Sequence, residues 1–467
     1  MEAYLKPKRY INMHLLKQIV LFALPIMAMN ILQLLFNAAD MIIVGRYSGS
    51  HALAAVGATG SLINLLVNLF MGLSVGISVV VARDYGAHRD DDINRSLHTS
   101  IAVGIFSGVF VMIVGILFCK PLLAMMGTPV DIIDASALYM RIYFLGIPAT
   151  MVYNFGAGAL RATGDSKRPM YFLTIAGIVN VVLNMFFVVV LGMSVDGVAL
   201  ATTISQYLSA FLVLFTFSKE AGALHFSTKK IKIHKQKLVD IVRIGIPAGL
   251  QSTLFSVSNV LIQSAINSFG STAVAASAAA ANIEGIVSTS TTALYNSAIT
   301  FTGQSMGARD YDRIDETAKV VTVLIFASWI LIGGLTVVFG RPLLSIYTTD
   351  SEVVELGLMR IKIMMVAYFT AGAMNVYPGL TRAMGYSISP MLSTLFGAVL
   401  MRIAWLLTIF KQYPTQAVLF AAYPVTWAIS GLGQVLIFFY ARKRVREKDR
   451  LQEAHDAEAT EETLAAE

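Results

Sequence analysis

The segment from Leu21 to Gly45 reads LFALPIMAMNILQLLFNAADMIIVG. It is long enough to cross a bilayer, because a spanning helix needs roughly 20 mostly apolar residues. Four of its polar residues are spaced three, four and three positions apart, so on a helix they form one narrow stripe. These residues are Asn30, Gln33, Asn37 and Asp40. The segment is therefore predicted to be a membrane-spanning helix with one polar face.

Asp40 carries the only charge in this stripe. A carboxylate inside a membrane span is costly even on the lenient insertion scales, so Asp40 should face a protein interior or a wet cavity. A structural polar contact between two helices is the alternative. Four polar groups in line favour the wall of a cavity. Asn30, Gln33 and Asn37 are accordingly candidates for the lining of a substrate cavity.

The composition of the chain extends this prediction to the whole protein. The 467 residues are 56% hydrophobic and 13% charged, whereas soluble proteins carry about 25% charged residues. We therefore expect a polytopic, all-helical membrane protein. The net charge of +7 does not indicate nucleic-acid binding, because the basic residues lie in short loops. Cys119 is the single cysteine, so no intramolecular disulfide is possible. The first apolar run is read as a retained span, because no cleavage site follows it.

Apolar runs predict twelve spanning helices, because lipid cannot satisfy any open backbone structure. The first six lie near 15–44, 52–81, 98–118, 138–160, 170–192 and 196–217. The second six lie near 239–268, 274–300, 318–339, 359–380, 391–410 and 415–441.

The two sets of six spans repeat each other. GALRATGDSKRPM at 158–170 and GLTRAMGYSISPM at 379–391 are identical at seven of thirteen positions, with an offset of 221 residues. The same offset joins the Lys120 and Arg341 segments, which read KPLL and RPLL. Several matches in one frame indicate two homologous halves. Because each half has an even number of spans, the repeats are parallel.

The distribution of Lys and Arg between the loops predicts the orientation of the spans in the membrane. With a cytoplasmic N-terminus, the inside segments hold 27 of the 35 basic residues and the outside segments hold seven. This asymmetry places both termini in the cytoplasm. The predicted parts are an N-terminal lobe (1–217), a basic cytoplasmic linker (218–238), a C-terminal lobe (239–441) and a polar, disordered tail (442–467).

Span seven has a polar stripe of its own, and the two halves differ in charge. The span-seven stripe contains Ser252, Ser256, Asn259 and Gln263, which are further candidates for the cavity. At an offset of 222, Asn37 corresponds to Asn259 but Asp40 corresponds to Ile262, so the acid is confined to the first half.

Hydrogen-bonding residues in spans five and six are candidate partners for Asp40. Asn180 and Asn184 are four residues apart and share one helix face. With Asp40 and either Thr202 or Thr203, they would offer carboxylate, amide and hydroxyl oxygens, which suit a proton on the acid or a Na⁺ ion. Plain hydrogen bonding between helices is the alternative.

Glu284 is a second acid well inside a span, with Asn282 beside it. Glu284 either binds a cation or proton in the cavity, or pairs with Arg402 if the fold brings the two together. The sequence leaves these readings open.

The chain lacks the sequence motifs of several enzyme classes. The chain has no G-x-x-x-x-G-K-[ST] loop, no H-E-x-x-H pair and no G-x-S-x-G elbow. Two parallel six-span halves without another domain instead fit a secondary transporter with its site between the halves. The rivals are a flippase for a lipid-linked precursor, which would need a strongly cationic cavity, and a membrane-embedded enzyme or sensor.

The chain resembles the MATE family, the multidrug and toxic compound extrusion transporters. The resemblance covers about 15–441 and rests on FNAAD at 36–40, GALRATGD at 158–165, NVVLN at 180–184 and DGVALAT at 196–202. It implies two six-helix lobes arranged in a V, and export of organic cations in exchange for H⁺ or Na⁺, with no other cofactor.

The resemblance also implies roles for individual residues. Asp40 stands at the family's coupling position, with Asn180 and Asn184 at the partner positions. Some members have aspartate where this chain has Asn184, which leaves Na⁺ open beside H⁺. Glu284 matches an acid of the DinF-like branch, whereas the acids of the NorM-like branch are absent near Ser256 and Ala371. We therefore expect a monomeric, DinF-like, multi-pass protein of the inner membrane, surrounded by lipid.

Overall fold

The computed structural model describes residues 12–466, and this part of the chain contains helices and loops but no strand. The first half forms α1 (Met13–Ile43), η1 (Val44–Ser48), α2 (Gly49–Gly57), α3 (Gly60–Gly86), α4 (Asp90–Met125), α5 (Val130–Leu145), α6 (Ile147–Ala162), α7 (Lys167–Asn184), η2 (Met185–Val190) and α8 (Val195–Lys219). A short turn, η3 (Thr228–Lys230), follows in the linker.

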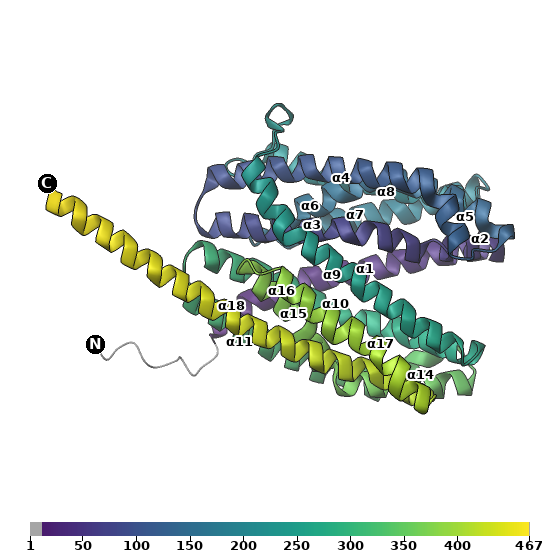
Figure 1. Ribbon diagram of the computed structural model, residues 1–467. Helices are drawn as coiled ribbons and strands as arrows, with labels where there is room; N and C mark the ends of the chain where they lie inside the picture. Colours follow the sequence, from purple (N-terminus) through teal and green to yellow (C-terminus); the bar gives the residue numbers. More distant parts are fainter. Residues whose placement is uncertain (1–11, 467) are drawn as a thin grey trace.

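The second half repeats this order. It forms α9 (Lys235–Asn267), α10 (Ser271–Gly307), α11 (Tyr311–Ser328), η4 (Trp329–Gly333), α12 (Gly334–Val338), α13 (Gly340–Ser345), α14 (Ser351–Val366), α15 (Tyr368–Ala383), α16 (Ile388–Thr394), η5 (Leu395–Leu400), α17 (Met401–Trp405), η6 (Leu406–Phe410) and α18 (Gln416–Ala466). Figure 1 shows the two halves as two bundles lying side by side.

The internal repeat extends to the backbone. α14 and α15 begin and end 221 residues after α5 and α6. Left-handed turn residues recur at the same offset: φ is +97° at Gly164 and +95° at Gly385, and it is +53° at both His88 and Arg309. A non-glycine residue in this region is uncommon, so its recurrence at one offset reflects a shared loop structure.

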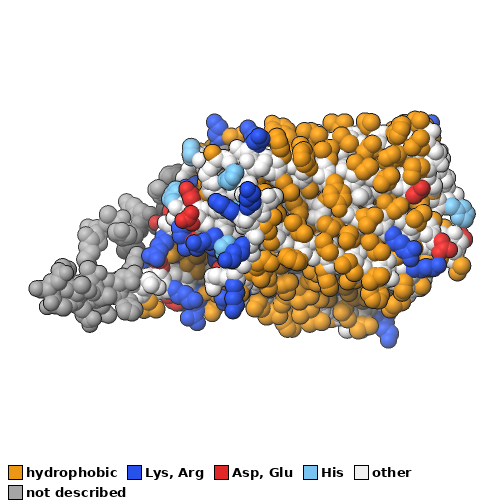
Figure 2. Space-filling view, turned by 90° about the horizontal axis from the view of Figure 1, so that it is seen from above, with side chains coloured by type: hydrophobic (Ala, Val, Ile, Leu, Met, Phe, Trp, Pro, Cys, Tyr) orange, Lys and Arg blue, Asp and Glu red, His pale blue; other side chains and the backbone are white. Residues whose placement is uncertain are grey.

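Nine helices in the described part of the chain are individually long and apolar enough to cross a membrane. The other three predicted spans are not among these nine helices. Two of them are divided into shorter helices, and the third is less apolar. Span four is divided into α5 and α6 at Gly146, and span ten into α14 and α15 at Ala367, 221 residues later. Span eight is the long helix α10, which is rich in Ala, Ser and Thr. Figure 2 shows the resulting apolar belt, with charged side chains gathered toward the two ends of the molecule.

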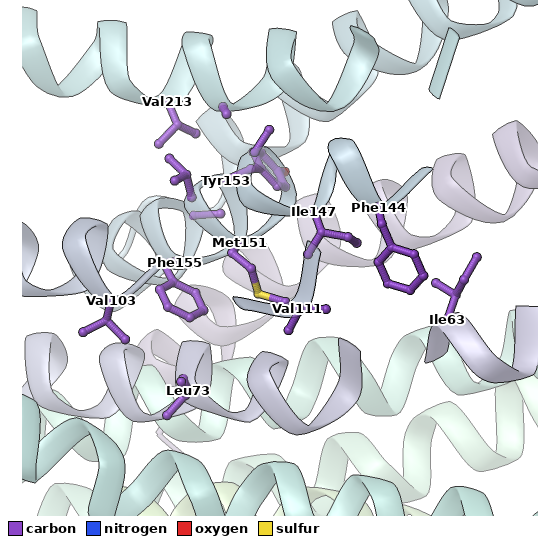
Figure 3. Close-up of a cluster of buried hydrophobic side chains, with 14 of the residues drawn as sticks. Ile63, Leu73, Val103, Val111, Phe144, Ile147, Met151, Tyr153, Phe155 and Val213 are labelled. Atoms are coloured by element: carbon purple, nitrogen blue, oxygen red, sulfur yellow. The ribbon is translucent and has the colours of Figure 1, made fainter. Parts of the chain in front are cut away.

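The core of the first bundle surrounds α6, whose side chains are buried on nearly every face (Figure 3). Phe155 and Met151 are fully buried there, together with Phe144 at the end of α5. Gly104 and Gly115 of α4 lie against the rings of Phe155 and Phe144, where a Cβ would meet the ring atoms. This packing holds α5 and α6 at the centre of the lobe.

The first helix of each half is shared between the lobes. The beginning of α1 packs into the second bundle, where Phe22 contacts Phe301 of α10 with the ring centroids 5.6 Å apart. The beginning of α9 packs on α3, and a Cβ at Gly72 would lie 2.1 Å from the backbone nitrogen of Gly249. Figure 1 shows α1 running obliquely between the bundles. The lobe boundary in space therefore differs from the boundary predicted along the chain.

The prediction of a disordered tail is corrected, because α18 continues as a helix to Ala466. The tail is rich in Ala, Glu, Lys and Arg, which are good helix formers. Arg442 and Arg446 fix its base through ion pairs to Asp315 of α11, and beyond it the helix stands away from the bundle (Figure 1). Three basic residues counted in the N-terminal arm, Lys6, Lys8 and Arg9, lie outside the described residues.

Candidate functional site

Asp40 lies near the end of α1, beside α7 and α8. Asn184 of α7 donates a hydrogen bond from Nδ2 to the Asp40 carboxylate. The same Nδ2 lies 3.3 Å from Oδ1 of Asn180, and Nδ2 of Asn180 lies 3.3 Å from Oγ1 of Thr202 on α8. Asn184 is 0% exposed and Asn180 is 5% exposed. Four residues that sequence analysis proposed as partners thus form one connected chain of hydrogen bonds.

The structure distinguishes between the two candidate threonines. Thr202 accepts the hydrogen bond from Asn180 and donates to the Val198 carbonyl in its own helix. Thr203 donates to the Ile142 carbonyl of α5, at 2.9 Å, and faces away from the network. Of the alternatives that the sequence left open, Thr202 belongs to the site.

The network combines a carboxylate with amide and hydroxyl oxygens, which are hard ligands. Oδ1 of Asn184 is buried and has no hydrogen-bond partner among the described residues. Buried acceptors are rarely left unpaired, so this oxygen is available to a proton held on Asp40 or to a small cation. Within the described part of the chain, no group of three or more His, Cys, Asp or Glu side chains could hold a metal ion.

Two aromatic residues that sequence analysis missed belong to the surroundings of Asp40. Tyr139 and Tyr143 of α5 stack on each other, with ring centroids 6.0 Å apart, and lie near enough to Asp40 for its charge to act on their hydroxyls. Both tyrosines fall within the predicted fourth span, four residues apart and therefore on one helix face. A pair of tyrosines at that spacing in a span was the signal available in the sequence.

The polar stripe of α1 follows the same side of the helix as the residues that pack into the second bundle, and it ends at Asp40, which lies against α7 of the first lobe. At about 100° per residue, Asn30, Gln33 and Asn37 share a face with Ile19 and Phe22, which pack into the second bundle. Gln33 and Asn37 are exposed, and Asn30 is half-buried. The stripe therefore lies on the same side of α1 as Ile19 and Phe22, in a part of the helix where the side chains are no longer covered by the second bundle.

α9 has the same arrangement in the second half. Its stripe, from Ser252 to Gln263, shares a face with Gly245 and Gly249, where α9 touches α3 of the first lobe. Ser252 and Gln263 are exposed, whereas Ser256 and Asn259 are half-buried. The two stripes thus lie on α1 and α9, the helices that both lobes share, and Gln33, Asn37, Ser252 and Gln263 are exposed there.

Glu284 does not pair with Arg402. Its carboxylate accepts two hydrogen bonds from Arg360 of α14, at 3.0 and 2.9 Å. The Arg360 and Glu284 side chains are only 7% and 12% exposed. The pairing between Glu284 and Arg402 that the sequence left open is therefore wrong. The sequence predicts Arg360 at the end of a span, and periodicity along one helix carries no information about the partner helix. The neighbouring Asn282 is exposed.

The lobes are joined at one end by a pair of matched contacts. Nε of Arg83 on α3 donates to the Ala383 carbonyl at 2.9 Å, and Nε2 of Gln304 on α10 donates to the Ala162 carbonyl at 2.8 Å. Each residue of one bond stands 221 positions from its counterpart in the other. Gly307 of α10 lies directly against the Arg83 carbonyl, with 1.9 Å between a built Cβ and that oxygen. This end of the molecule also carries the loops rich in Lys and Arg.

Comparison with known proteins identifies the relatives of this chain. The model of the MatE family matches residues 25–186 and 247–406, once in each half. The probable multidrug resistance protein YoeA of Bacillus subtilis is 30% identical over 435 residues, which cover 90% of this chain and 92% of that protein. The multidrug export protein MepA of Staphylococcus aureus is 22% identical and covers 92% of this chain and 94% of its own length.

Solved structures share the fold. The Vibrio cholerae MATE transporter VcmN superposes with a TM-score of 0.86 at 21% identity, over 92% of this chain and 98% of that one. An outward-facing multidrug resistance MATE transporter gives a TM-score of 0.84 at 22% identity, over 95% and 100%. The predicted fold, twelve helices in two six-helix lobes, is confirmed.

Proposed function

Because the chain belongs to the MatE family of membrane transporters, we propose that it exports organic cations from the cytoplasm in exchange for H⁺ or Na⁺. It is a multidrug efflux transporter and not an enzyme. The observation that carries the coupling proposal is the hydrogen-bonded chain from Asp40 through Asn184 and Asn180 to Thr202. It holds one ionisable acid among neutral oxygens in a lobe that crosses the membrane.

The coupling ion acts on this network. A proton on Asp40, or a Na⁺ bound by its carboxylate with the oxygens of Asn184 and Thr202, removes the net negative charge of the site. The bond between α1 and α7 then changes, and α1 is the helix shared by the two lobes. An ion shifts the equilibrium between access states only by its difference in affinity for the two states, about 1.4 kcal/mol for each factor of ten.

We place the protein in the cell membrane as a multi-pass monomer with both termini in the cytoplasm, since Lys and Arg gather in the corresponding loops. The sealed contact between Arg83 and Ala383 then lies on the cytoplasmic side, and the stripes of α1 and α9 face outward. In this arrangement small organic cations leave toward the outside. Lipid surrounds the apolar belt in Figure 2. Glu284, together with the absence of acids near Ser256 and Ala371, supports placing the chain in the DinF-like branch.

The flippase reading is disfavoured by the charge of the two stripes. A lipid-linked pyrophosphate needs a strongly cationic cavity, whereas the stripes of α1 and α9 contain no basic residue. Their single charge is the acid Asp40.

The test is ion-driven transport by the purified protein in liposomes. Ethidium uptake or release is followed while a Na⁺ gradient or a pH gradient is imposed separately, with liposomes of the Asp40→Asn variant as control. Transport driven by Na⁺ alone supports a Na⁺ site at Asp40, Asn180 and Asn184, whereas transport driven by pH alone makes Asp40 the proton carrier. A folded protein that responds to neither gradient contradicts the proposal, and a lipid-scrambling assay then tests the flippase reading.

A further inference from the structure

A cavity of about 530 Å³ lies at the basic end of the molecule, beside the seal between the lobes. The seal consists of the contacts that Arg83 makes with Ala383 and Gly307. The cavity wall combines the end of α3 with the beginning of α9, the turns after α10 and α15, and α18. Small-molecule sites commonly have volumes of about 300–1,000 Å³, so this cavity has room for a ligand. It has no part in the site at Asp40.

The cavity collects positive charge from five separate segments of the chain. Its cations are Arg83, Arg89, Arg243, Arg309 and Lys448, and the acids among its lining residues are Asp240 and Asp449. The lining thus has five cations against two acids, a net charge of +3. The acidic oxygens that pair with Arg89 and Arg309 lie 3.5 and 4.0 Å away. Like charges gathered in one cavity repel one another, and a bound anion would offset that repulsion.

Three of these cations have no acidic partner within ion-pair distance. Arg243 and Lys448 form no ion pair within the described part of the chain. Among the described residues, the guanidinium of Arg83 donates one hydrogen bond, from Nε to the Ala383 carbonyl at 2.9 Å. Its Nη2 lies 2.9 Å from the place that a Cβ would take at Gly385, where φ is +95°. Glycine at this turn therefore leaves room beside the Arg83 guanidinium.

The internal repeat provides a comparison for this cavity. A second cavity, of about 790 Å³, lies at the same end of the molecule and is lined by counterparts of the same residues. At an offset of 221, Gln304 takes the place of Arg83. At an offset of 222, Leu21 takes the place of Arg243. The same backbone arrangement thus carries neutral side chains in one cavity and arginines in the other.

Most of the charge in the second cavity is compensated. Arg168 forms ion pairs with both Asp165 and Glu220, and the other cations of the lining, Lys167 and Arg313, are exposed. The general excess of Lys and Arg in cytoplasmic loops would favour basic residues at both cavities alike. It does not account for an uncompensated set that is confined to one of them.

We propose that the cavity lined by Arg83, Arg243 and Lys448 binds a phosphate group and thereby holds the two lobes together at the seal. Arginine matches the geometry of phosphate, and a phosphate monoester carries about −1.5 to −2 charges at pH 7, which suits a lining of net charge +3. The inference goes beyond the proposed function, because it concerns a regulatory anion and not a transported substrate.

Such a ligand would act on the equilibrium between access states. Arg83 belongs to α3 of the first lobe and Lys448 to α18 of the second, so an anion between them has its full set of partners when the seal is closed. It favours the closed seal by its difference in affinity for the two states. The phosphate group has two sources with the same chemistry, a soluble phosphate compound and the headgroup of phosphatidic acid.

The first measurement is the binding of labelled inorganic pyrophosphate to the purified full chain in detergent, by equilibrium dialysis at constant ionic strength. We expect one site per chain. Arg243→Gln combined with Lys448→Gln should raise the dissociation constant on the order of tenfold, because two of the five cations are lost. Lys167→Gln combined with Arg313→Gln removes two exposed cations from the second cavity. This matched control should bind pyrophosphate like the wild type.

A variant with the opposite effect keeps the test decisive if the first double variant does not fold. Asp449→Asn removes an acid from the lining and should therefore lower the dissociation constant of pyrophosphate. Spin labels on the two lobes at the basic end should report shorter distances when pyrophosphate is added to the wild type. The Arg243→Gln, Lys448→Gln variant should show no such change.

The source of the phosphate group is identified by repeating the spin-label measurement in micelles that contain phosphatidic acid or, as control, phosphatidylcholine. A response to phosphatidic acid without a response to pyrophosphate assigns the cavity to the lipid headgroup. If neither phosphate compound binds, or if both double variants weaken binding equally, the inference is wrong. None of these measurements requires transport, so a failure of the proposed function would be seen separately, in the liposome assay.

Discussion

At the scale of single residues, the two lobes treat buried charge in opposite ways. Asp40 in the first lobe is hydrogen-bonded to an amide and has no basic partner among the described residues. Glu284 in the second lobe is locked to Arg360 by two hydrogen bonds. A carboxylate with a neutral partner can gain a proton or bind a cation at moderate cost. A carboxylate paired with a buried arginine cannot do so without leaving the charge of that arginine buried and unpaired. Asp40 is thus suited to coupling and Glu284 to structure.

Replacing Asp40 by Asn should strongly reduce ion-driven transport while the protein stays folded. Asparagine has nearly the same shape and can keep the contact with Asn184, but it cannot hold a proton or a net negative charge. We expect the initial rate of transport to fall by at least about tenfold. A loss of roughly 1.4 kcal/mol in the free energy of ion binding at Asp40 corresponds to that factor. Asp134→Asn, an exposed acid that pairs with Lys120, is the control and should transport normally.

Replacing Glu284 by Gln should destabilise the second lobe. The change leaves Arg360 buried without its counter-charge, and breaking such a pair costs about 3–5 kcal/mol. Thermal unfolding in detergent should therefore occur at a clearly lower temperature. The double variant Glu284→Leu with Arg360→Met removes both charges and should recover most of the loss. A single variant with unchanged unfolding would show that the pair has no structural role.

At the scale of helices, close approach of backbones determines where the lobes can touch. α3 and α10 meet at Gly86 and Gly307, and α3 meets α9 at Gly72 and Gly249. At each contact a side chain would occupy the space of a backbone atom of the partner helix. Glycine is unfavourable inside helices, and here it permits backbone contact between lobes. Gly86 and Gly307 lie in the seal at the basic end of the molecule, and Gly72 and Gly249 extend the contact between the lobes to the middle of α3 and α9.

Replacing Gly307 by Ala should weaken the seal between the lobes. The new methyl group would lie 1.9 Å from the Arg83 carbonyl oxygen, so one helix must move, at a cost of about 1–3 kcal/mol. Spin labels on the two lobes at the basic end should report a larger separation, and transport should fall. Gly285→Ala lies in the same helix with no atom near the added methyl group, so it should leave both measurements unchanged.

At the scale of the whole molecule, two similar lobes are linked by exchanged helices. The beginning of α1 packs in the second lobe, and the beginning of α9 packs on the first. A change at Asp40, near the end of α1, is therefore transmitted along a helix that both lobes hold. Separation of the lobes at the seal, with closure at the opposite end, would expose the stripes of α1 and α9 to each side of the membrane in turn.

A disulfide across the seal should stop this motion. A Cβ built at Gly303 of α10 lies 2.7 Å from Cβ of Ala82 on α3, close enough for a disulfide after a small adjustment. The Ala82→Cys, Gly303→Cys protein, with Cys119 replaced by Ser, should lose transport on oxidation and regain it on reduction. The single Gly303→Cys variant is the control. Full transport by the oxidised, cross-linked protein would show that the lobes need not separate at this point.

The sequence by itself determined the class of protein, the twelve spans, the internal repeat and the residues on each polar stripe. These properties depend on periodicity, composition and self-similarity, which are local or need only alignment of the chain with itself. It also brought Asp40, Asn180, Asn184 and Thr202 together as candidates, because each offers oxygen ligands at helical spacing, and the structure joins them by hydrogen bonds.

Tertiary structure alone decided the partners across helices. Asp40 meets Asn184, 144 residues away, Glu284 meets Arg360 rather than Arg402, and α1 begins in the opposite lobe from the one in which it ends. A helical pattern fixes which side chains share a face, but it does not fix which helix packs against that face. That choice follows from the crossing of the helices and from the glycines that let their backbones meet.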